Sequence, residues 1–236
     1  LISWNWKAAD HDRSLATINQ DGSITSLVSA NQAAGFSIVR FSGPATNVTA
    51  TVGHGLSAAP ELVITKILDS SVNWYTSIGG ITGNDNDYLS LNTSDAVNNN
   101  SSFVFGPHSS NTFTTSQAFS GNNPSIAYCF HSVAGYQKVD SYQGNTTTLP
   151  SVDLGFSPRF VMIKETTDTG SWLIYDNVRP SDPATQNNKI LFADSSALES
   201  TSSGNVLNFT STGFDIEAGS SELNTNGNTY IYLAIA

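Results

Sequence analysis

Short apolar runs alternate with clusters of Gly, Asn, Ser and Asp from residue 35 to the end of the chain. Several of these runs alternate apolar and polar side chains with a period of two, among them Phe36–Phe41, Val206–Phe209 and Phe214–Glu217. That period places successive side chains on opposite faces of a β-strand. No window carries an apolar stripe at helical spacing, so at most one helical turn is expected, near residues 193–201. Short strands separated by turn residues predict an all-β protein of antiparallel, sandwich-like sheets.

The same succession of runs and turns occurs twice, about one hundred residues apart. The matched blocks agree in residue type and order: Gly35–Phe41 with Gly135–Asp140, Leu62–Lys66 with Phe160–Lys164, Trp74-Tyr75 with Trp172-Leu173, and Ile126–Phe130 with Tyr230–Ala234. Their offset changes only from 98 to 104 residues, which indicates a tandem duplication. The predicted organisation is an N-terminal strand and linker in residues 1–34, a first β module in residues 35–134 and a second in residues 135–236.

A glycine and a proline precede the most apolar strand of each copy, Gly55 with Pro60 and Gly155 with Pro158. Glycine is suited to a turn position with positive φ, and a proline just before a strand removes no ladder hydrogen bond. We interpret both pairs as structural.

The N-terminal segment also alternates, with Ile2, Trp4 and Trp6 at every second position. We interpret this segment as one more strand. An unpaired strand edge is a template for a strand of another chain. These three residues are therefore candidates for an inter-subunit strand.

Composition and charge exclude several classes of function. Nine Lys and Arg residues against nineteen Asp and Glu residues give a net charge of −10, which opposes binding to nucleic acid and to anionic membranes. No apolar run approaches the ~18 residues that span a bilayer, so no membrane insertion is expected. The single cysteine, Cys129, excludes an internal disulfide and is expected to be a small buried hydrophobe.

Candidate catalytic groups are present but form no convincing pattern. Neither His54 nor His131 recurs in the second copy, and no G-x-S-x-G elbow accompanies the histidines, which also include His11 and His108. A repeated scaffold suits a structural protein or a multivalent binder better than a single asymmetric catalytic site. The sequence therefore predicts no enzymatic activity, no catalytic residues and no cofactor.

Paired carboxylates are typical glycosidase groups and can also bind a cation. The pairs at i and i+2 are Asp10 with Asp12, Asp85 with Asp87, and Asp215 with Glu217, and neither of the two pairs within the repeat recurs in the other copy. The turn at residues 83–87 offers several oxygen ligands for calcium, but it lacks the regular D-x-D-x-D-G spacing and the distal Glu. Solvated surface carboxylates are the preferred interpretation, and no metal site is predicted.

Aromatic side chains after a core strand of each copy are the candidates for contact with a glycan or a protein partner. They are Trp74 and Tyr75 in the first copy and Trp172 and Tyr175 in the second. An aromatic ring can pack against the apolar face of a sugar, and it can equally fill a repeated core. Trp74 and Trp172 favour the core interpretation, whereas Tyr75 and Tyr175 are expected to be partly exposed.

Several phrases together resemble a known repeat module. They are Trp4-Asn5-Trp6-Lys7-Ala8, Ala33-Ala34-Gly35-Phe36-Ser37-Ile38-Val39, Val52-Gly53-His54-Gly55-Leu56, Ala127-Tyr128-Cys129-Phe130, Gly155-Phe156-Ser157-Pro158-Arg159-Phe160-Val161-Met162-Ile163-Lys164 and Thr229-Tyr230-Ile231-Tyr232-Leu233-Ala234. The chain is similar over essentially its whole length to the repeat module of large structural proteins of marine tailed phages, which is often found beside lectin-like domains.

The resemblance implies a non-enzymatic virion structural protein: a tail fibre, another tail component or a capsid decoration, at the virion surface or otherwise extracellular. Its expected partners are other copies of itself, in a homo-oligomer, or other virion proteins, with host attachment through a surface glycan. Two alternatives stay open, a carbohydrate-binding module and a self-assembling extracellular filament subunit.

Overall fold

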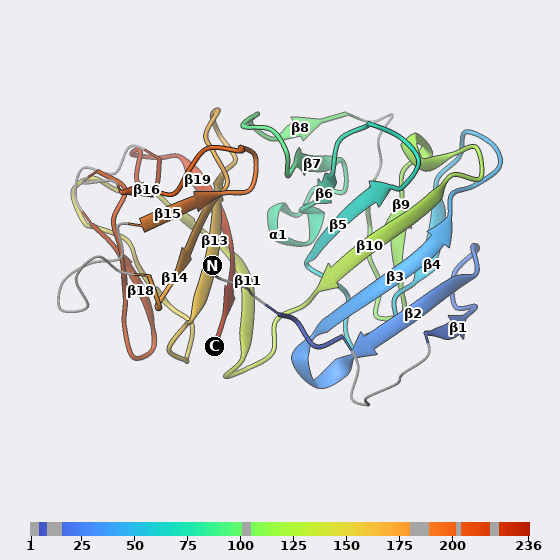
Figure 1. The fold of residues 1–236 in the computed structure, drawn as a ribbon, viewed down its shortest axis with the longest axis horizontal. Coiled ribbons are helices and arrows are strands. Elements are labelled where there is room, and N and C mark those ends of the chain that lie inside the picture. The colour runs from blue at the N-terminus through green and yellow to red at the C-terminus, as the bar shows by residue number, and fades with distance from the viewer. Residues whose placement is uncertain (1–4, 9–15, 101–104, 180–188, 202–203, 218–221) are drawn as a thin grey trace. The chain divides into compact units, whose positions relative to one another are not determined.

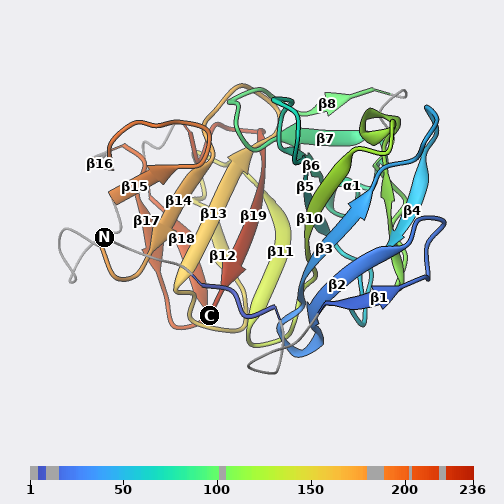
Figure 2. The ribbon, with the colours of Figure 1, turned by 45° about the vertical axis from the view of Figure 1, so that its right-hand side comes forward.

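A computed structural model describes residues 5–8, 16–100, 105–179, 189–201, 204–217 and 222–236. The chain divides into two compact units, drawn as ribbons in Figure 1 and Figure 2. The first unit contains Leu1–Leu89 and Asn98–Val133, and the second contains Ser90–Val97 and Ala134–Ala236. Both units consist of antiparallel sheets, so the predicted all-β, sandwich-like fold class is confirmed.

The first unit is built from a large sheet and a two-stranded sheet. The large sheet contains, in spatial order, β1 (Thr17–Asn19), β2 (Ser26–Asn31), β3 (Phe36–Ser42), β10 (Pro124–Phe130), β5 (Leu62–Ile67), β6 (Tyr75–Ser77), β7 (Asp87–Ser90) and β8 (Asn98–Asn99). The small sheet pairs β4 (Ala50–Gly53) with β9 (Thr112–Thr115).

Apolar side chains from one face of the large sheet form the core of the first unit. Val39 lies opposite Val28 in β2 and Ala127 in β10, and all three side chains are buried. Phe113 of the small sheet belongs to the same cluster and packs edge-on against Phe41, with ring centroids 5.7 Å apart. The apolar side chains of the period-two pattern therefore fill the core of this unit.

Cys129 lies in this core as a free, buried cysteine, which confirms the interpretation of its sequence context. Burial raises the pKa of its thiol to about 12, so the unreactive thiol is the form present at neutral pH.

The second unit repeats the plan of the first. Its large sheet contains, in spatial order, β11 (Gln137–Gln143), β19 (Thr229–Ile235), β13 (Phe160–Glu165), β14 (Leu173–Asp176), β15 (Lys189–Phe192) and β16 (Ser200–Thr201). Its small sheet contains β12 (Ser151–Asp153), β18 (Gly213–Ile216) and β17 (Leu207–Phe209).

Tyrosines fill much of the core of the second unit. Tyr142 stacks on Tyr230 with ring centroids 5.0 Å apart, and its hydroxyl donates to the carbonyl of Leu223 at 2.9 Å. Phe214 packs edge-on against Tyr232 at 5.4 Å. These rings add apolar area to the core, and the hydroxyl of the partly buried Tyr142 has a hydrogen-bond partner.

The duplication is visible in the strand order of the two units. The order β3-β10-β5-β6-β7-β8 in the first corresponds to β11-β19-β13-β14-β15-β16 in the second, and the pair β4-β9 corresponds to β12-β18. Gly55 and Gly155 both adopt positive φ, 70° and 75°, as the turn interpretation predicts. The amides just before them make matching bonds, His54 to Asn111 O and Leu154 to Thr212 O.

Hydrogen bonds define the equivalent residues of the two copies more closely than sequence does. The amide of Glu61 donates to the carbonyl of Phe130, and the matching amide of Arg159 donates to that of Ile235. Phe130 is therefore equivalent to Ile235, one residue beyond the Ala234 that the sequence match indicates.

The described N-terminal residues contribute strands to the first unit. β1 and β2 extend its large sheet beyond β3. Of the candidate inter-subunit strand, Ile2 and Trp4 lie outside the described residues. Trp6 is half-buried in a segment without regular strand structure.

Helices are minor elements of the described chain: the 3-10 turns η1 (Gln32–Ala34) and η2 (Gln117–Phe119) and the single α-turn α1 (Gly79–Thr82). Residues 193–201, where the sequence allowed at most one helical turn, form a loop and β16. None of the helices in the described ranges is long and apolar enough to cross a membrane.

Candidate functional site: the seat of Ser90–Val97

One segment of the first copy belongs to the second unit. Ser90–Val97 runs from the last residue of β7 to the residue before β8, yet these eight residues are part of the second unit. The chain leaves the first unit after Leu89 and returns to it at Asn98. An alternating sequence pattern does not indicate that a segment between two strands of one unit belongs to the other unit.

Backbone hydrogen bonds join this segment to the connection between β13 and β14. The amide of Val97 donates to the carbonyl of Thr166 at 2.9 Å. In the reverse direction, the amide of Gly170 donates to the carbonyl of Ser94 at 2.8 Å. Since both are backbone contacts, they depend on the shape of the two segments more than on side-chain identity.

Trp172 adds a side-chain contact at the start of the segment. Its indole Nε1 donates to the carbonyl of Ser90 at 3.0 Å, and the ring is buried. Its own amide donates to a carboxylate oxygen of Asp194 at 2.8 Å. A buried indole N–H requires an acceptor, and the segment supplies it.

Lys164 contributes a buried charge beneath the segment. Its side chain is 0% exposed, and Nζ donates to the carbonyls of Glu165 at 2.6 Å and Ser94 at 3.4 Å. Burial lowers the pKa of this ammonium to about 8, and the carboxylates of Glu165, Asp194 and Asp95 act in the opposite direction. The ammonium is therefore still charged at neutral pH and attracts the carbonyl oxygens of the segment. We call Lys164, Thr166, Gly170 and Trp172 the internal seat.

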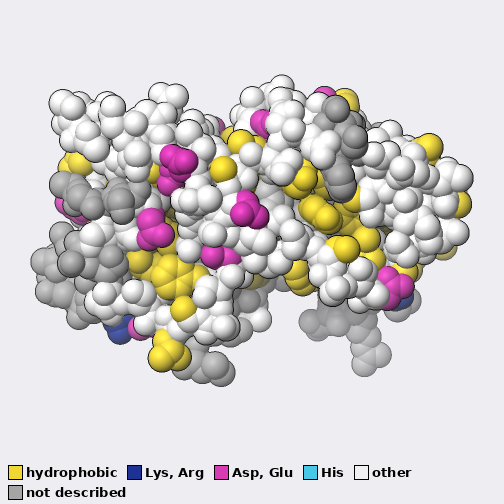
Figure 3. Space-filling view, turned by 90° about the horizontal axis from the view of Figure 1, so that it is seen from above, with side chains coloured by type: hydrophobic (Ala, Val, Ile, Leu, Met, Phe, Trp, Pro, Cys, Tyr) yellow, Lys and Arg dark blue, Asp and Glu magenta, His cyan; other side chains and the backbone are white. Residues whose placement is uncertain are grey.

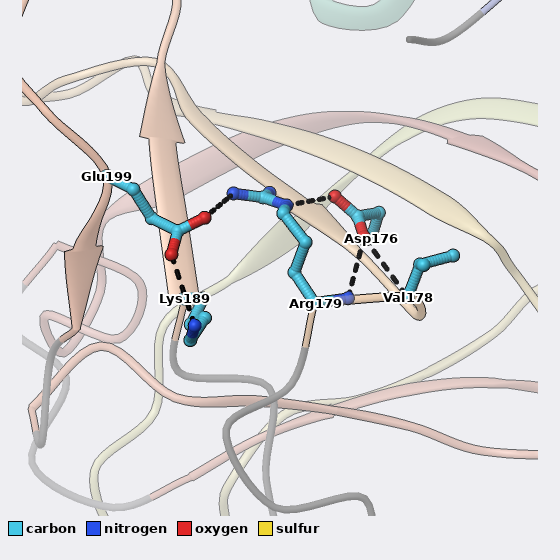
Figure 4. Close-up of polar contacts among 5 residues, drawn as sticks. All are labelled: Asp176, Val178, Arg179, Lys189 and Glu199. Carbon is cyan, nitrogen blue, oxygen red and sulfur yellow. Dashed lines mark hydrogen bonds and ion pairs between the residues drawn. The ribbon is translucent and has the colours of Figure 1, made fainter. Parts of the chain in front are cut away.

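A network of ion pairs joins the end of β14 to β15 and to the loop before β16 (Figure 4). Asp176 accepts hydrogen bonds from the amides of Val178 and Arg179, at 3.0 and 3.1 Å, and from Nε of Arg179 at 2.5 Å. Arg179 also bonds Glu199 at 2.8 Å, and Lys189 lies 3.3 Å from the same carboxylate. The hydrogen bond from Arg179, together with the charge of Lys189, lowers the pKa of Glu199. The network thereby fixes the loop that ends at Glu199.

The aromatic candidates do not come together at one surface. Trp74 is half-buried and stacks on Tyr128, with ring centroids 6.4 Å apart. Tyr75 is half-buried in the core of the first unit, edge-on to Tyr88 at 5.8 Å.

In the second unit both candidates are core residues. Trp172 is buried, as favoured by the sequence, but Tyr175 is buried as well and donates its hydroxyl to the carbonyl of Asn205 at 3.2 Å. The expectation that Tyr175 is partly exposed is therefore wrong, and neither ring is accessible to a glycan in this structure. The reason is that β14 turns the Tyr175 side chain into the tyrosine-rich core.

Two of the histidines are structural groups of the first unit, held in neutral form. His54 Nδ1 accepts from the amide of Leu56 at 3.0 Å, so its proton is on Nε2, which contacts the carbonyl of Ser109 at 3.1 Å. His108 Nδ1 accepts from the amide of Thr114 at 3.3 Å. His11 lies outside the described residues, and His131 is buried with Nδ1 2.8 Å from the carbonyl of Ser132.

The His108 ring makes the first unit sensitive to acid. Burial, reinforced by the nearby His54, lowers the pKa of His108 to about 4, against 6.5 in an unfolded chain. The unfolded state binds the extra proton first, so this stability is present above pH 6.5 and is lost as the pH falls towards 4.

We therefore expect acidification to about pH 5 to cost wild-type protein roughly 2 kcal/mol through this group. His108→Gln removes the titration while keeping a polar side chain, and it should reduce the loss between pH 7.5 and 5 by about that amount. Urea unfolding at the two pH values measures the difference. An identical pH dependence in the variant would contradict a buried neutral His108.

The carboxylate pairs act as surface and turn residues. Asp87 accepts from Nδ2 of Asn99 at 2.6 Å, and Glu217 accepts from Nδ2 of Asn208. Asp10 and Asp12 lie outside the described residues. No group of three or more His, Cys, Asp or Glu side chains suited to a metal ion occurs in the part of the chain that the structure describes. Acidic side chains are more widespread than basic ones on the face shown in Figure 3.

One family model matches the entire chain, residues 1–236, and its description is "domain of unknown function (DUF7483)". The chain belongs to this family. No curated protein and no solved structure matches it. The description of the DUF7483 family names no activity, and a function is therefore inferred from the geometry of each unit.

The sequence interpretation missed the internal seat of this DUF7483 chain. One signal was available, because Lys66 and Lys164 occupy the same position of matched strands in both copies. A lysine repeated within an apolar run indicates a carbonyl-binding role, and both ammonium groups bind the carbonyl of the following residue. The second half of the site, Ser90–Val97, gives no comparable signal.

Proposed function

We propose that this chain is a non-enzymatic structural component of an extracellular assembly, specifically a phage fibre, tail or capsid-surface component. One observation carries the proposal: the two units share strand order, turn glycines and the strand lysine, whereas their histidines and carboxylates are not repeated. A scaffold that is duplicated without its histidines and carboxylates favours a role in assembly and in the presentation of surface loops. The polar, weakly charged loops would meet a neighbouring protein or a host surface.

Electron microscopy with a gold-labelled antibody against the chain tests this proposal on native source material. Label on the appendages or shell of phage particles is the expected result. Label along free filaments would favour the extracellular filament subunit instead, and label on neither kind of assembly would contradict a structural role. A pre-immune antibody on the same grids is the control.

A carbohydrate-binding module is the second candidate, favoured by the Trp74–Tyr128 pair. These rings are stacked and half-buried, so part of an aromatic surface is accessible on the first unit. Such a surface can pack on a pyranose ring. Glycan-array binding that is lost in Trp74→Ala and Tyr128→Ala, and kept in the control Tyr136→Ala, would favour this function over a purely structural one.

A further inference from the structure

The internal seat of the second unit has an equivalent in the first unit. β5-β6 and β13-β14 have the same register, with Thr65 opposite Tyr75 and Ile163 opposite Leu173, so the offset between the two hairpins is 98 residues throughout. The two hairpin connections also make matching hydrogen bonds. The amide of Leu68 donates to the carbonyl of Pro124, and the amide of Thr166 donates to that of Thr229. The equivalents of the internal seat, which we call the outer seat, are Lys66, Leu68, Val72 and Trp74.

The outer seat is open where the internal seat is covered. Leu68 is 50% exposed and Val72 is 37% exposed, whereas their equivalent Thr166 is buried and Gly170 is half-buried. Two exposed apolar side chains on one hairpin connection, at positions that bind a segment in the other copy, indicate a seat for a similar segment.

Lys66 shows the same difference in its hydrogen bonds. Like Lys164, it donates to the carbonyl of the next residue, Ile67. Its second acceptor is the carbonyl of Ser70 in its own hairpin connection, where Lys164 uses the carbonyl of Ser94. Both carbonyl acceptors of the Lys66 ammonium therefore lie within four residues of Lys66 itself.

The second copy also contains an equivalent of the bound segment. β7-β8 and β15-β16 have matching registers, with Asp87 opposite Asn99 and Lys189 opposite Thr201, which gives an offset of 102 residues. Ser90–Val97 thus corresponds to residues 192–199. Both segments contain the same local turn, from the amide of Asp95 to Thr93 Oγ1 and from that of Ala197 to Ser195 Oγ.

This second segment, residues 192–199, is exposed along most of its length. Residues 195–199 are all exposed, and Leu198 is 89% exposed. Its equivalent Ala96 is half-buried in the second unit. The outer seat and this segment both carry larger apolar side chains than their equivalents in the internal seat and in Ser90–Val97, and these side chains are exposed. They are Leu68 and Val72 in the outer seat and Leu198 in the segment.

We propose that residues 192–199 of one chain bind the outer seat of a second copy, as Ser90–Val97 binds the internal seat. The amide of Glu199 then donates to the carbonyl of Leu68, and the amide of Val72 donates to the carbonyl of Ser196, by equivalence with the two internal backbone bonds. The side chain of Leu198 is buried near Leu68 and Val72. Burial of these apolar side chains supplies the driving force.

The contact is heterologous, because the segment and the seat are different surfaces of the same chain. Repetition of a heterologous contact produces an open filament or a closed ring, whereas a two-fold contact stops at a dimer. This inference gives the proposed structural function a specific mode of assembly and rests on that function for its biological meaning. The contact itself follows from the equivalence of the two copies.

Two variants test the contact by sedimentation velocity over a wide range of protein concentration. Wild type is expected to form oligomers that grow with concentration. Leu198→Asp disables the segment and Leu68→Asp disables the seat, and each should raise the concentration for half-assembly by at least about tenfold. Val178→Asp replaces another highly exposed apolar side chain of the second unit and should behave as wild type. Unchanged circular dichroism confirms that the variants are folded.

Mixing the two disabled variants identifies the geometry. Leu198→Asp retains an intact seat and Leu68→Asp retains an intact segment, so an equimolar mixture should form one-to-one dimers and nothing larger. Wild type that stays monomeric at all concentrations would overturn the proposal, as would a mixture without dimers. Neither result would affect the labelling experiment, which tests the location of the chain independently.

Discussion

Trp172→Ala is expected to lower the free energy of unfolding of the second unit by about 3–5 kcal/mol. The ring is buried, and its loss leaves a cavity that a packed sheet fills only in part. The change also removes the donor to the carbonyl of Ser90, so the bound segment loses one of its contacts. Trp74→Ala, at the equivalent position of the first unit, should cost only about 1–2 kcal/mol because that ring is half-buried.

Urea unfolding followed by circular dichroism measures both losses. Hydrogen exchange should add a local result: the amides of Val97 and Gly170 exchange faster in Trp172→Ala, because the segment that they join is loosened. The same two amides should be unchanged in Trp74→Ala. Equal losses of stability in the two variants would show that the two tryptophans are packed alike, contrary to the structure.

Asp176→Ala is expected to lower the stability of the second unit by about 3 kcal/mol. Its carboxylate is buried and accepts from two amides and from Nε of Arg179 (Figure 4). The substitution leaves the largely buried guanidinium of Arg179 without this neighbouring charge and removes the acceptor of two amides. The unit should therefore unfold at lower urea concentration with an unchanged slope.

Asp140→Ala is the matched control for this prediction. Asp140 also pairs with a cation, Lys138, but the two charged atoms are 3.8 Å apart, and the side chains are 35% (Lys138) and 52% (Asp140) exposed. Water and salt screen such a pair, so the expected change is within about 0.5 kcal/mol. A loss in Asp176→Ala as small as in the control would contradict a buried ion-pair network.

Much of the fold could be predicted because its determinants are local or repeated. Alternation predicted strands such as Phe36–Phe41, and the repeat predicted two copies of one module. The glycines at 55 and 155 were interpreted as turn residues from their place before a strand, and both adopt positive φ. Each of these features is decided within a few residues of chain, where steric rules act directly.

Burial at the ends of strands could not be predicted in the same way. Trp74 and Trp172 occupy matched positions of the repeat, yet one is half-buried and the other is buried. The difference comes from Ser90–Val97, a segment about eighty residues away in sequence from the tryptophan that it covers. Tyr175 was expected to be partly exposed for a related reason, since an isolated strand does not show which face meets the larger core.

The sequence by itself determined the all-β class, the duplication, the positions of the turn glycines and the buried, inert cysteine. Those features follow from side-chain period, residue type and short-range sterics, which act along the chain. Only the tertiary structure decided that Ser90–Val97 joins the second unit, that its equivalent in the second copy is exposed, and that the outer seat is open. Such features depend on which backbone donors and acceptors meet across long separations, and the identity of neighbouring residues does not specify that pairing.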